Sequence, residues 1–455
     1  MTAMPAGRAS RAGGSPGFRR GAGAPALLLS RRFGPFFAVQ FLSAFNDLAL
    51  KTALVLMIAY RAAPGTAGTA KLLVTLASFL FILPFFLCSA SAGQFADETD
   101  KARLVRLIKL IELPVMLAAA GGVLAGSVPV LLVLLLVMGI EAAFFGPVKY
   151  AILPDLLAPA ELVLGNALVE AGTFLAILLG TIAGLLITGR HGAIAVAALI
   201  VAVAAAAIAV SLFVPATGAA ATRRRARWNL LAVTAAILCD AAGDKLPFRA
   251  MLGISWFWLA GATYLSQFPA YVRFTLGASA TVVTLFLVVF SIGIALGSLA
   301  CNRLLHGRIS ARTVPWGALG LGLFSIDLWL ASPSPTATAA LTGLVPFLAA
   351  PAHWRILADL LGIAVAGGLF IVPLYTLLQA TSARARRARV IAANNVVNAG
   401  AMVVSALLTM ALLAAGVSVA ALFLLTGVAS VAVAALFRLA LPGFAARPEL
   451  LEEHP

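Results

Sequence analysis

The chain has 455 residues, of which 62% are hydrophobic and only 11% are charged, and its formal net charge is +16. A soluble protein needs a polar exterior, so this composition excludes a soluble domain and indicates a polytopic membrane protein. In a membrane protein, a basic excess usually reflects orientation and contact with anionic lipid, so we expect no nucleic-acid partner. The three cysteines, Cys88, Cys239 and Cys301, lie in or beside apolar segments at no metal-ligand spacing. We therefore expect no metal and no other cofactor.

The first 32 residues are rich in Gly, Ala, Ser, Pro and Arg and lack the apolar core of a signal peptide. We expect a disordered basic cytoplasmic arm over 1–32. Apolar windows of about 20 residues, long enough to span a bilayer, then recur with short breaks. They lie near 33–60, 70–92, 103–125, 128–150, 162–188 and 193–214, and resume near 250–272, 279–301, 313–332, 355–379, 388–415 and 417–438.

The prediction is an all-α membrane protein with about 12 transmembrane helices in two six-helix halves. The N-terminal half covers 33–214, and the C-terminal half covers 250–438. Between them, 215–249 is a cytoplasmic central loop with the basic cluster "RRRAR", and its stretch "WNLLAVTAAILCDAA" could lie on the membrane surface as a helix. A cytoplasmic tail follows over 439–455.

Most of the 32 Lys and Arg residues fall in segments that are cytoplasmic if the N-terminus is cytoplasmic. Lys109, near the start of the third window, is counted among these cytoplasmic cations. The positive-inside rule therefore places both termini in the cytoplasm, which requires an even number of spans.

Six plus six spans around a basic central loop is the layout of the major facilitator superfamily, in which two halves enclose a site near the mid-plane. The loop after the second span, "GQFADETDKARL", resembles the cytoplasmic Gly-x-x-x-Asp…Arg motif of that superfamily. The matching residues are Gly93, Asp97 and Lys101 or Arg103. We expect this motif to make a gating contact.

Charged residues stand inside the apolar runs of the first half. Asp47 and Lys51, in "FFAVQFLSAFNDLALKTALVLMIAY", are four residues apart and share one face of a helix. Charge at the centre of a span costs about 2.5–3.5 kcal/mol on insertion scales. Either the two side chains neutralise each other, or their face lines a polar cavity.

Further along the first half, Glu141 and Lys149 flank a Gly-Pro break, and Asn166 and Glu170 lie four residues apart. Two interpretations stay open for these residues. They could form a buried ion-pair network that locks the helices together, or they could contact a ligand.

The spans of the second half carry few charges, Asp327 and Asp359, and their polar signal comes from amides. Gln267 lies in "TYLSQFPAYVR", and Asn394 and Asn398 lie one helical turn apart in "RVIAANNVVNAGAMV". These amides could bind a ligand or hydrogen-bond between helices. Asp327 is interpreted as a tolerated local charge. One charged wall and one amide-lined, apolar wall suit an amphiphile with a zwitterionic or anionic head.

Several blocks of the chain resemble the bacterial lysophospholipid transporters. They include "QFLSAFNDLALKTAL", "FFGPVKYAILPDLL", "LVLGNALVEAGTFLAILLGTIAG", "GISWFWLAGATYLSQFPA" and "RVIAANNVVNAG". The resemblance implies a flippase-like carrier in the bacterial inner membrane. It would move lysophosphatidylethanolamine and lysophosphatidylglycerol to the cytoplasmic leaflet, where an acyltransferase–acyl-carrier-protein synthetase re-acylates them.

The family's functional residues fall on Asp47, Lys149, Asn166, Glu170 and Asn394. The substrate-binding set that we predict adds Lys51, Asn398 and Gln267 to these five. The chain departs from the family pattern at Leu48, often a second amide, and it has no cation in the seventh span before Arg273.

Many relatives are fused to an acyltransferase, whose catalysis needs a His-x4-Asp pair. None of His191, His306 and His353 has an Asp five positions on. We therefore expect a transporter and not an enzyme.

Two other functions remain open. One is a proton-coupled exporter of drugs or other hydrophobic solutes, with Asp47 or Glu170 as the proton carrier. The other is a scaffold that docks an acyltransferase through the basic arm and the loop "ARARRAR". For the arginines of that loop, we expect anchoring on anionic headgroups.

Overall fold

The computed structural model describes residues 23–61, 67–185, 189–218, 230–333 and 341–440. Within these ranges the chain is helical, without strands apart from an isolated bridge between Ala278 and Thr342. Eleven of the described helices are long and apolar enough to cross a membrane. A further helix of 26 residues, α10, lies in the same bundle.

The long helices form two halves. The N-half contains α2 (Gly34–Arg61), α3 (Ala67–Glu98), α4 (Lys101–Ala125), α5 (Val128–Ala151), α7 (Leu162–Leu185) and α8 (Gly189–Ser211). The C-half contains α10 (Lys245–Ala270), α11 (Ala280–Leu305), α12 (Val314–Ala331), α14 (Pro351–Thr381), α15 (Arg387–Ala414) and α16 (Val419–Ala440). The third window, which opens with charged residues, is therefore a continuous membrane-length helix.

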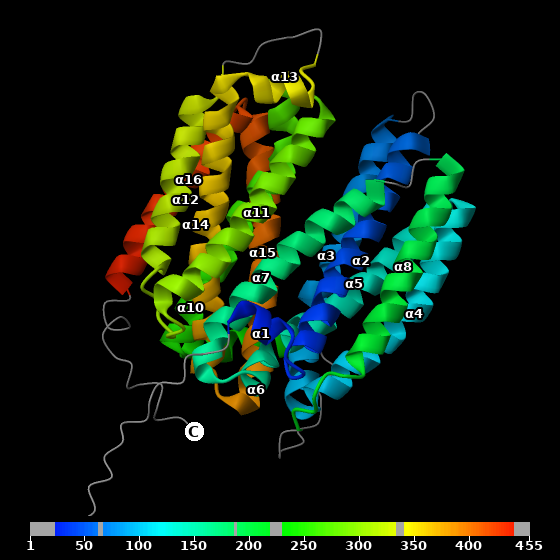
Figure 1. Ribbon diagram of the computed structural model, residues 1–455, viewed down its shortest axis with the longest axis vertical. Coiled ribbons are helices and arrows are strands. Elements are labelled where there is room, and N and C mark those ends of the chain that lie inside the picture. The colour runs from blue at the N-terminus through cyan, green and yellow to red at the C-terminus, as the bar shows by residue number, and fades with distance from the viewer. Residues whose placement is uncertain (1–22, 62–66, 186–188, 219–229, 334–340, 441–455) are drawn as a thin grey trace, which may run out of the picture.

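The halves meet at one end and diverge at the other. In Figure 1 the two groups of long helices approach each other at the lower end and separate toward the top. The packing between halves runs through α7 against α11 and α14, and through α3 and α5 against α15. Within each half, α2 packs on α7 and α8, and α14 packs on α11 and α12.

Helix ends and close crossings follow from local sequence. Asp100 caps α4 by accepting a hydrogen bond from the amide of Arg103 at 2.8 Å, and the helix ends at Gly126, whose φ of 64° suits glycine. Two glycines allow close crossings. A Cβ on Gly184 would lie 2.6 Å from the carbonyl oxygen of Ala49, and a Cβ on Gly368 would lie 2.6 Å from that of Ile294.

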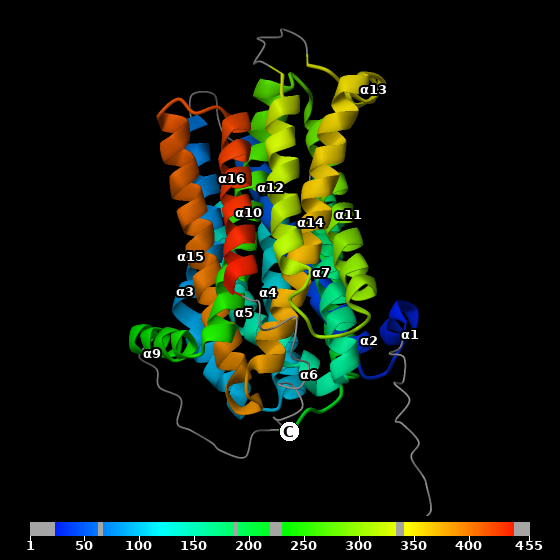
Figure 2. The same cartoon turned by 90° about the vertical axis from the view of Figure 1, so that its left-hand side faces the viewer.

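The lower end in Figures 1 and 2 carries short helices that lie outside the bundle: α1 (Ala24–Leu28), α6 (Leu153–Leu156) and α9 (Leu230–Gly243). Helix α9 lies across the direction of the long helices (Figure 2). It occupies the stretch predicted as a surface helix, and its place on the membrane surface stays a prediction. The opposite end carries α13 (Leu344–Ala349).

The last ten residues of the predicted disordered arm are ordered. Leu27 of α1 is fully buried, and Arg32 forms an ion pair with Glu161. The apolar side chain of Leu27 packs in the core, which holds the segment in place. Residues 1–22, the basic cluster of the central loop and the tail from 441 lie outside the described residues.

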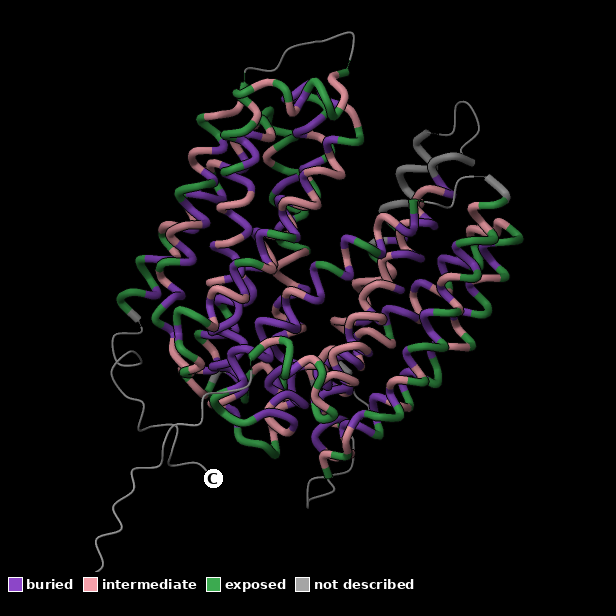
Figure 3. Tube along the Cα trace, in the orientation of Figure 1, coloured by how far each residue is buried: buried purple, intermediate pink, exposed green. Residues whose placement is uncertain are grey.

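Buried residues follow the faces between helices (Figure 3), whereas many large apolar side chains are exposed on the outer faces. Leu110 and Leu425, for example, are 60% and 47% exposed. Such a surface would be unfavourable in water and is expected where helices face lipid tails.

Candidate substrate site and contacts between the halves

A polar site lies where α2, α5 and α7 meet. The Nζ of Lys149 donates a hydrogen bond to Thr173 Oγ1 at 2.7 Å, and Thr173 Oγ1 lies 3.1 Å from Gln40 Oε1. Lys149 is half-buried and Gln40 is buried, with no hydrogen-bond partner for its Nε2 atom. The N-half therefore presents an ammonium and an unused amide donor close together.

Aromatic side chains join this site to the C-half. The Tyr150 hydroxyl donates to Glu170 Oε1 at 2.5 Å, and its ring stacks on Tyr375 of α14 with centroids 4.0 Å apart. The indole of Trp258 donates to the Tyr375 hydroxyl at 3.3 Å. Glu170 Oε2 has no hydrogen-bond partner, and both amide atoms of the buried Asn394 lack one with hydrogen-bonding geometry, although Asn394 lies near the Tyr375 hydroxyl. Buried polar atoms without partners are costly, so these atoms are suited to meet a ligand.

The predicted pair of Asp47 and Lys51 does not form. Lys51 Nζ lies over the ring of Phe81, 5.5 Å from its centroid. Asp47 is half-buried, makes no hydrogen bond within the described part of the chain, and interacts electrostatically with Lys109 and Lys149. The two residues share a helix but not an ion pair, so mutual neutralisation does not explain their presence.

A second polar cluster inside the N-half was missed by sequence reasoning. Lys109 of α4 donates to Glu112, to Glu141 Oε1 at 2.7 Å and to Ser43 Oγ at 2.7 Å. The amide of Asn46 donates to Glu112 Oε1 at 3.1 Å. We call Ser43, Asn46, Asp47, Lys109, Glu112 and Glu141 the N-half charge cluster.

The cytoplasmic placement of Lys109 was wrong, because this side chain is only 1% exposed and paired in the core. Its spacing of three residues from Glu112 in "LIKLIEL" was the available signal, since residues i and i+3 are neighbours on a helix. The sequence left open whether Glu141 belongs to a buried ion-pair network or contacts a ligand. In the structure it belongs to an ion-pair network.

Asn166 lies in a contact between the halves. Its amide exchanges two hydrogen bonds with the Gln379 amide of α14, at 2.7 and 2.9 Å, and also approaches the Thr376 hydroxyl at 3.3 Å. Asn166 and Gln379 are both fully buried. This reciprocal pair occupies the polar atoms of Asn166, which is placed to hold the halves together.

The remaining predicted amides are bonded within the C-half. Asn398 accepts from the Ser255 hydroxyl at 2.8 Å, and Gln267 donates to Ser266 at 3.3 Å. Gln267 stands nine residues beyond Trp258 on α10, which corresponds to about 13 Å along the helix. Among the described contacts, no hydrogen bond joins Gln267 to Lys149, and the role of Gln267 in binding stays a prediction. Asp327 forms a bidentate pair with Arg355.

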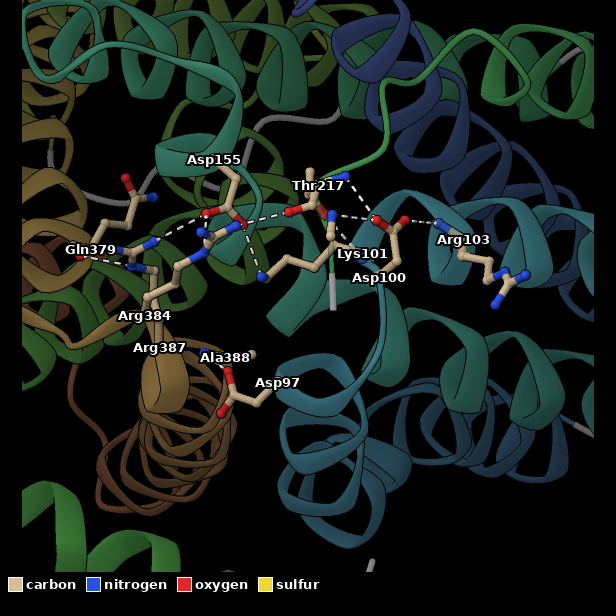
Figure 4. Close-up of polar contacts among 11 residues, drawn as sticks. Asp97, Asp100, Lys101, Arg103, Asp155, Thr217, Gln379, Arg384, Arg387 and Ala388 are labelled. Atoms are coloured by element: carbon tan, nitrogen blue, oxygen red, sulfur yellow. Dashed lines mark hydrogen bonds and ion pairs between the residues drawn. The ribbon is translucent and has the colours of Figure 1, made fainter. Parts of the chain in front are cut away.

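The predicted gating residues lie at the end where the halves meet (Figure 4). Asp97 of α3 accepts from the amides of Ala388 at 2.8 Å and Arg389 at 3.2 Å, and from Arg389 Nε at 3.0 Å. An acid from the N-half thus caps the first turn of α15 in the C-half. Gly93 keeps the helices close, because a Cβ there would lie 2.8 Å from the Ala388 carbonyl oxygen.

Asp155 of α6 is a second link between the halves and was also missed. It accepts from Lys101 Nζ at 2.9 Å and lies 3.3 Å from Arg384 Nε and 3.7 Å from Arg387 Nη1 (Figure 4). Arg386 pairs with Asp244. The arginines before and at the start of α15 therefore pair with carboxylates of the protein, and their anchoring on lipid headgroups stays a prediction.

The Arg103 side chain is exposed and only its amide takes part in this region, bonding Asp100. Burial works against ionisation of Asp100, but hydrogen bonds from the amides of Arg103, Thr217 and Gly218 outweigh it and lower the pKa of this carboxyl. Asp100 therefore ties the start of α4 to the segment after α8.

Two six-helix halves, joined by ion pairs at one end and enclosing polar side chains within their spans, define a secondary transporter of the major facilitator type. Residues 36–350 match the family described as Major Facilitator Superfamily. Among solved structures, the human organic anion transporter MFSD10 superposes with a TM-score of 0.68 at 16% identity, covering 90% of this chain and 98% of that one. A bacterial homologue of ferroportin in the outward-facing state gives 0.64 at 15% identity, covering 91% and 99%.

A curated relative narrows the family. The lysophospholipid transporter LplT of Yersinia pestis (strain Pestoides F) is 30% identical over 363 residues, which are 77% of this chain and 79% of the relative. The chain belongs to the LplT-type family of the major facilitator superfamily. It is a multi-pass membrane transporter, and its relatives are transporters rather than enzymes.

Proposed function

We propose that this transporter moves lysophospholipids, such as lysophosphatidylethanolamine and lysophosphatidylglycerol, to the cytoplasmic leaflet of the bacterial inner membrane. A separate acyltransferase–acyl-carrier-protein synthetase would re-acylate them there. The observation that carries the proposal is the 30% identity to a named lysophospholipid transporter over 363 residues. Both termini, and the end of the bundle with Asp97 and Asp155, would be cytoplasmic.

The chemistry of the polar site suits such a substrate. The phosphate of a lysolipid would take the Lys149 ammonium in place of its bond to Thr173, and the free Gln40 amide would donate to a phosphate oxygen. A charged hydrogen bond of this kind is stronger than a neutral one. When the headgroup carries an ammonium, Glu170 Oε2 would accept from it, since this oxygen has no other partner.

The C-half would contribute neutral contacts. The amide of Asn394 can both donate to and accept from the glycerol hydroxyl, and its two polar atoms have no partner with hydrogen-bonding geometry. The acyl chain would remain in lipid while the head crosses between the halves. Inward release requires the halves to separate at the cytoplasmic end, which means breaking the Asn166–Gln379 pair and the bonds of Asp97 and Asp155.

The test is uptake of a fluorescent lysophosphatidylethanolamine by spheroplasts of a strain that lacks its own carrier. Expression of this chain should restore conversion of the probe to the diacyl lipid, which occurs only after the probe reaches the cytoplasmic leaflet. No conversion from a chain inserted at normal levels would refute the proposal. Uncoupler-sensitive export of an unrelated hydrophobic solute, without lysolipid uptake, would support the exporter instead.

A further inference from the structure

The buried charges of the N-half charge cluster do not balance. Lys109 is the only cation that bonds to the cluster's described acids, and its Nζ donates to Glu112, Glu141 and Ser43. An ammonium has three N–H donors and no acceptor, so these bonds use all of them. The geometry is that of a charged lysine.

Three carboxyl groups face this single ammonium. Glu112 and Glu141 bond to it directly, and Asp47 interacts electrostatically with Lys109 and with both glutamates. If all three were ionised, the cluster would hold two more negative than positive charges within membrane-spanning helices. Uncompensated charge is strongly unfavourable there.

The neighbouring cations do not remove the imbalance. Lys149 bonds to Thr173 and interacts electrostatically with Glu170, which it compensates. Lys51 lies over Phe81 and makes no ion pair with Asp47 in the described structure. Even if Lys51 is counted as a second cation of the cluster, three ionised carboxylates would leave one net negative charge. Among the described residues, the charged groups that face the cluster come from four helices: Asp47 and Lys51 from α2, Lys109 and Glu112 from α4, Glu141 and Lys149 from α5, and Glu170 from α7. From the described part of α8, the Ile200 carbonyl accepts from Asn46.

The hydrogen bonds indicate where a compensating cation would be held. Both oxygens of Glu112 already accept, one from Asn46 and one from Lys109, as in a carboxylate. Glu141 accepts from Lys109 through one oxygen only, and Asp47 has no hydrogen bond among the described residues. Asn46 is fully buried and its Oδ1 has no donor.

We propose that the N-half charge cluster binds one exchangeable proton, held between Asp47 and Glu141. The proton exchanges with water through Asp47 and Glu141, the two partly exposed carboxyl groups of the cluster. Only an O–H bond forms or breaks. The inference concerns a second ligand and stands apart from the proposed lysolipid function.

Infrared spectroscopy of the purified full-length protein in detergent tests the proposal directly. At neutral pH the wild-type protein should show the carbonyl stretch of a protonated carboxyl group. Asp47→Asn and Glu141→Gln, measured separately, should each weaken or shift this band. Asp240→Asn, which changes an exposed acid on α9, should leave it unchanged. If the band is the same in wild type and both cluster variants, the proposal is wrong.

Thermal unfolding gives an independent readout. A proton bound by the folded protein and not by the unfolded chain makes Tm fall as pH rises. Glu141→Gln needs no such proton, so its Tm should depend less on pH, and Asp240→Asn should follow the wild type. The wild-type Tm could instead rise in sodium chloride relative to choline chloride and not change with pH. That result would mean that the cluster binds sodium, and the proton proposal would be wrong.

Discussion

The two halves hold their buried polar groups in different ways. At the centre of the N-half, charged side chains pair with one another, as Lys109 does with Glu112 and Glu141. At the centre of the C-half, neutral groups pair, as Tyr264 does with Ser325 at 2.5 Å and Thr263 with Ser405 at 2.7 Å. Because its buried charges must balance, the stability of the N-half should depend strongly on single substitutions and on bound cations. The stability of the C-half should change little when one member of a neutral hydrogen-bonded pair is removed.

The largest effect should come from Lys109→Met. Removing this ammonium leaves Glu112 and Glu141 buried without a counter-charge, and breaking a buried pair in this way costs about 3–5 kcal/mol. We expect little monodisperse protein by size-exclusion chromatography and a much lower Tm. Lys245→Met, at an exposed position at the start of α10, is the control. Equal yields for both variants would mean that the N-half does not depend on this ion pair.

The contact between the halves should be the next most sensitive. Asp97→Asn weakens charged hydrogen bonds to the first turn of α15, each worth about 1.5–3 kcal/mol. The variant should open more often at the end where the halves meet. The measurement is labelling of a cysteine placed at Ala392, which packs against Gly93, by a membrane-impermeant reagent from the cytoplasmic side. The matched control carries Glu98→Gln, which changes the next acid on α3, a residue without an ion pair among the described residues. Equal labelling rates would show that Asp97 does not hold the halves together.

In the C-half, Tyr264→Phe should cost only about 1 kcal/mol, the typical net worth of a neutral hydrogen bond. The ring keeps its packing against Phe423, with centroids 5.4 Å apart, and the Ser325 hydroxyl still donates to the Leu321 carbonyl. We expect a small decrease in Tm. A decrease as large as that of Lys109→Met would remove the contrast between the halves.

The last prediction concerns Asp100, which lies outside the spans. Asn keeps one acceptor oxygen for the amide of Arg103, but its NH2 group cannot accept from the amides of Thr217 and Gly218, so Asp100→Asn should lose those two bonds as well as the charge, which alone is worth about 0.3–1 kcal/mol. Because the folded-state pKa of Asp100 is lowered, its contribution is present above the unfolded pKa and is lost as pH falls through the folded value. The Tm difference between wild type and variant should therefore shrink in acid. A constant difference would show that charge is not involved.

The spans could be predicted from sequence because apolar length alone sets them, and α4 and α14 begin within four residues of the expected positions. The hydrogen-bond and ion-pair partners of the polar side chains could not be predicted from the sequence. Lys109 follows a basic run, and its spacing of three residues from Glu112 indicates a possible pair but does not show that the pair is buried. Asn166 and Gln379 are 213 residues apart, and nothing local to either predicts their pairing. Asp155 carries no sequence signal of its own, since it becomes a link only when η3 (Arg384–Arg386) approaches it.

The most direct test of the account concerns the ammonium at the polar site. In the spheroplast uptake assay, Lys149→Gln should abolish conversion of fluorescent lysophosphatidylethanolamine, Lys149→Arg should retain part of it, and Arg103→Gln should match the wild type. All three must be inserted at equal levels. Wild-type uptake by Lys149→Gln would contradict the account, because the headgroup would then cross between the halves without its proposed phosphate ligand.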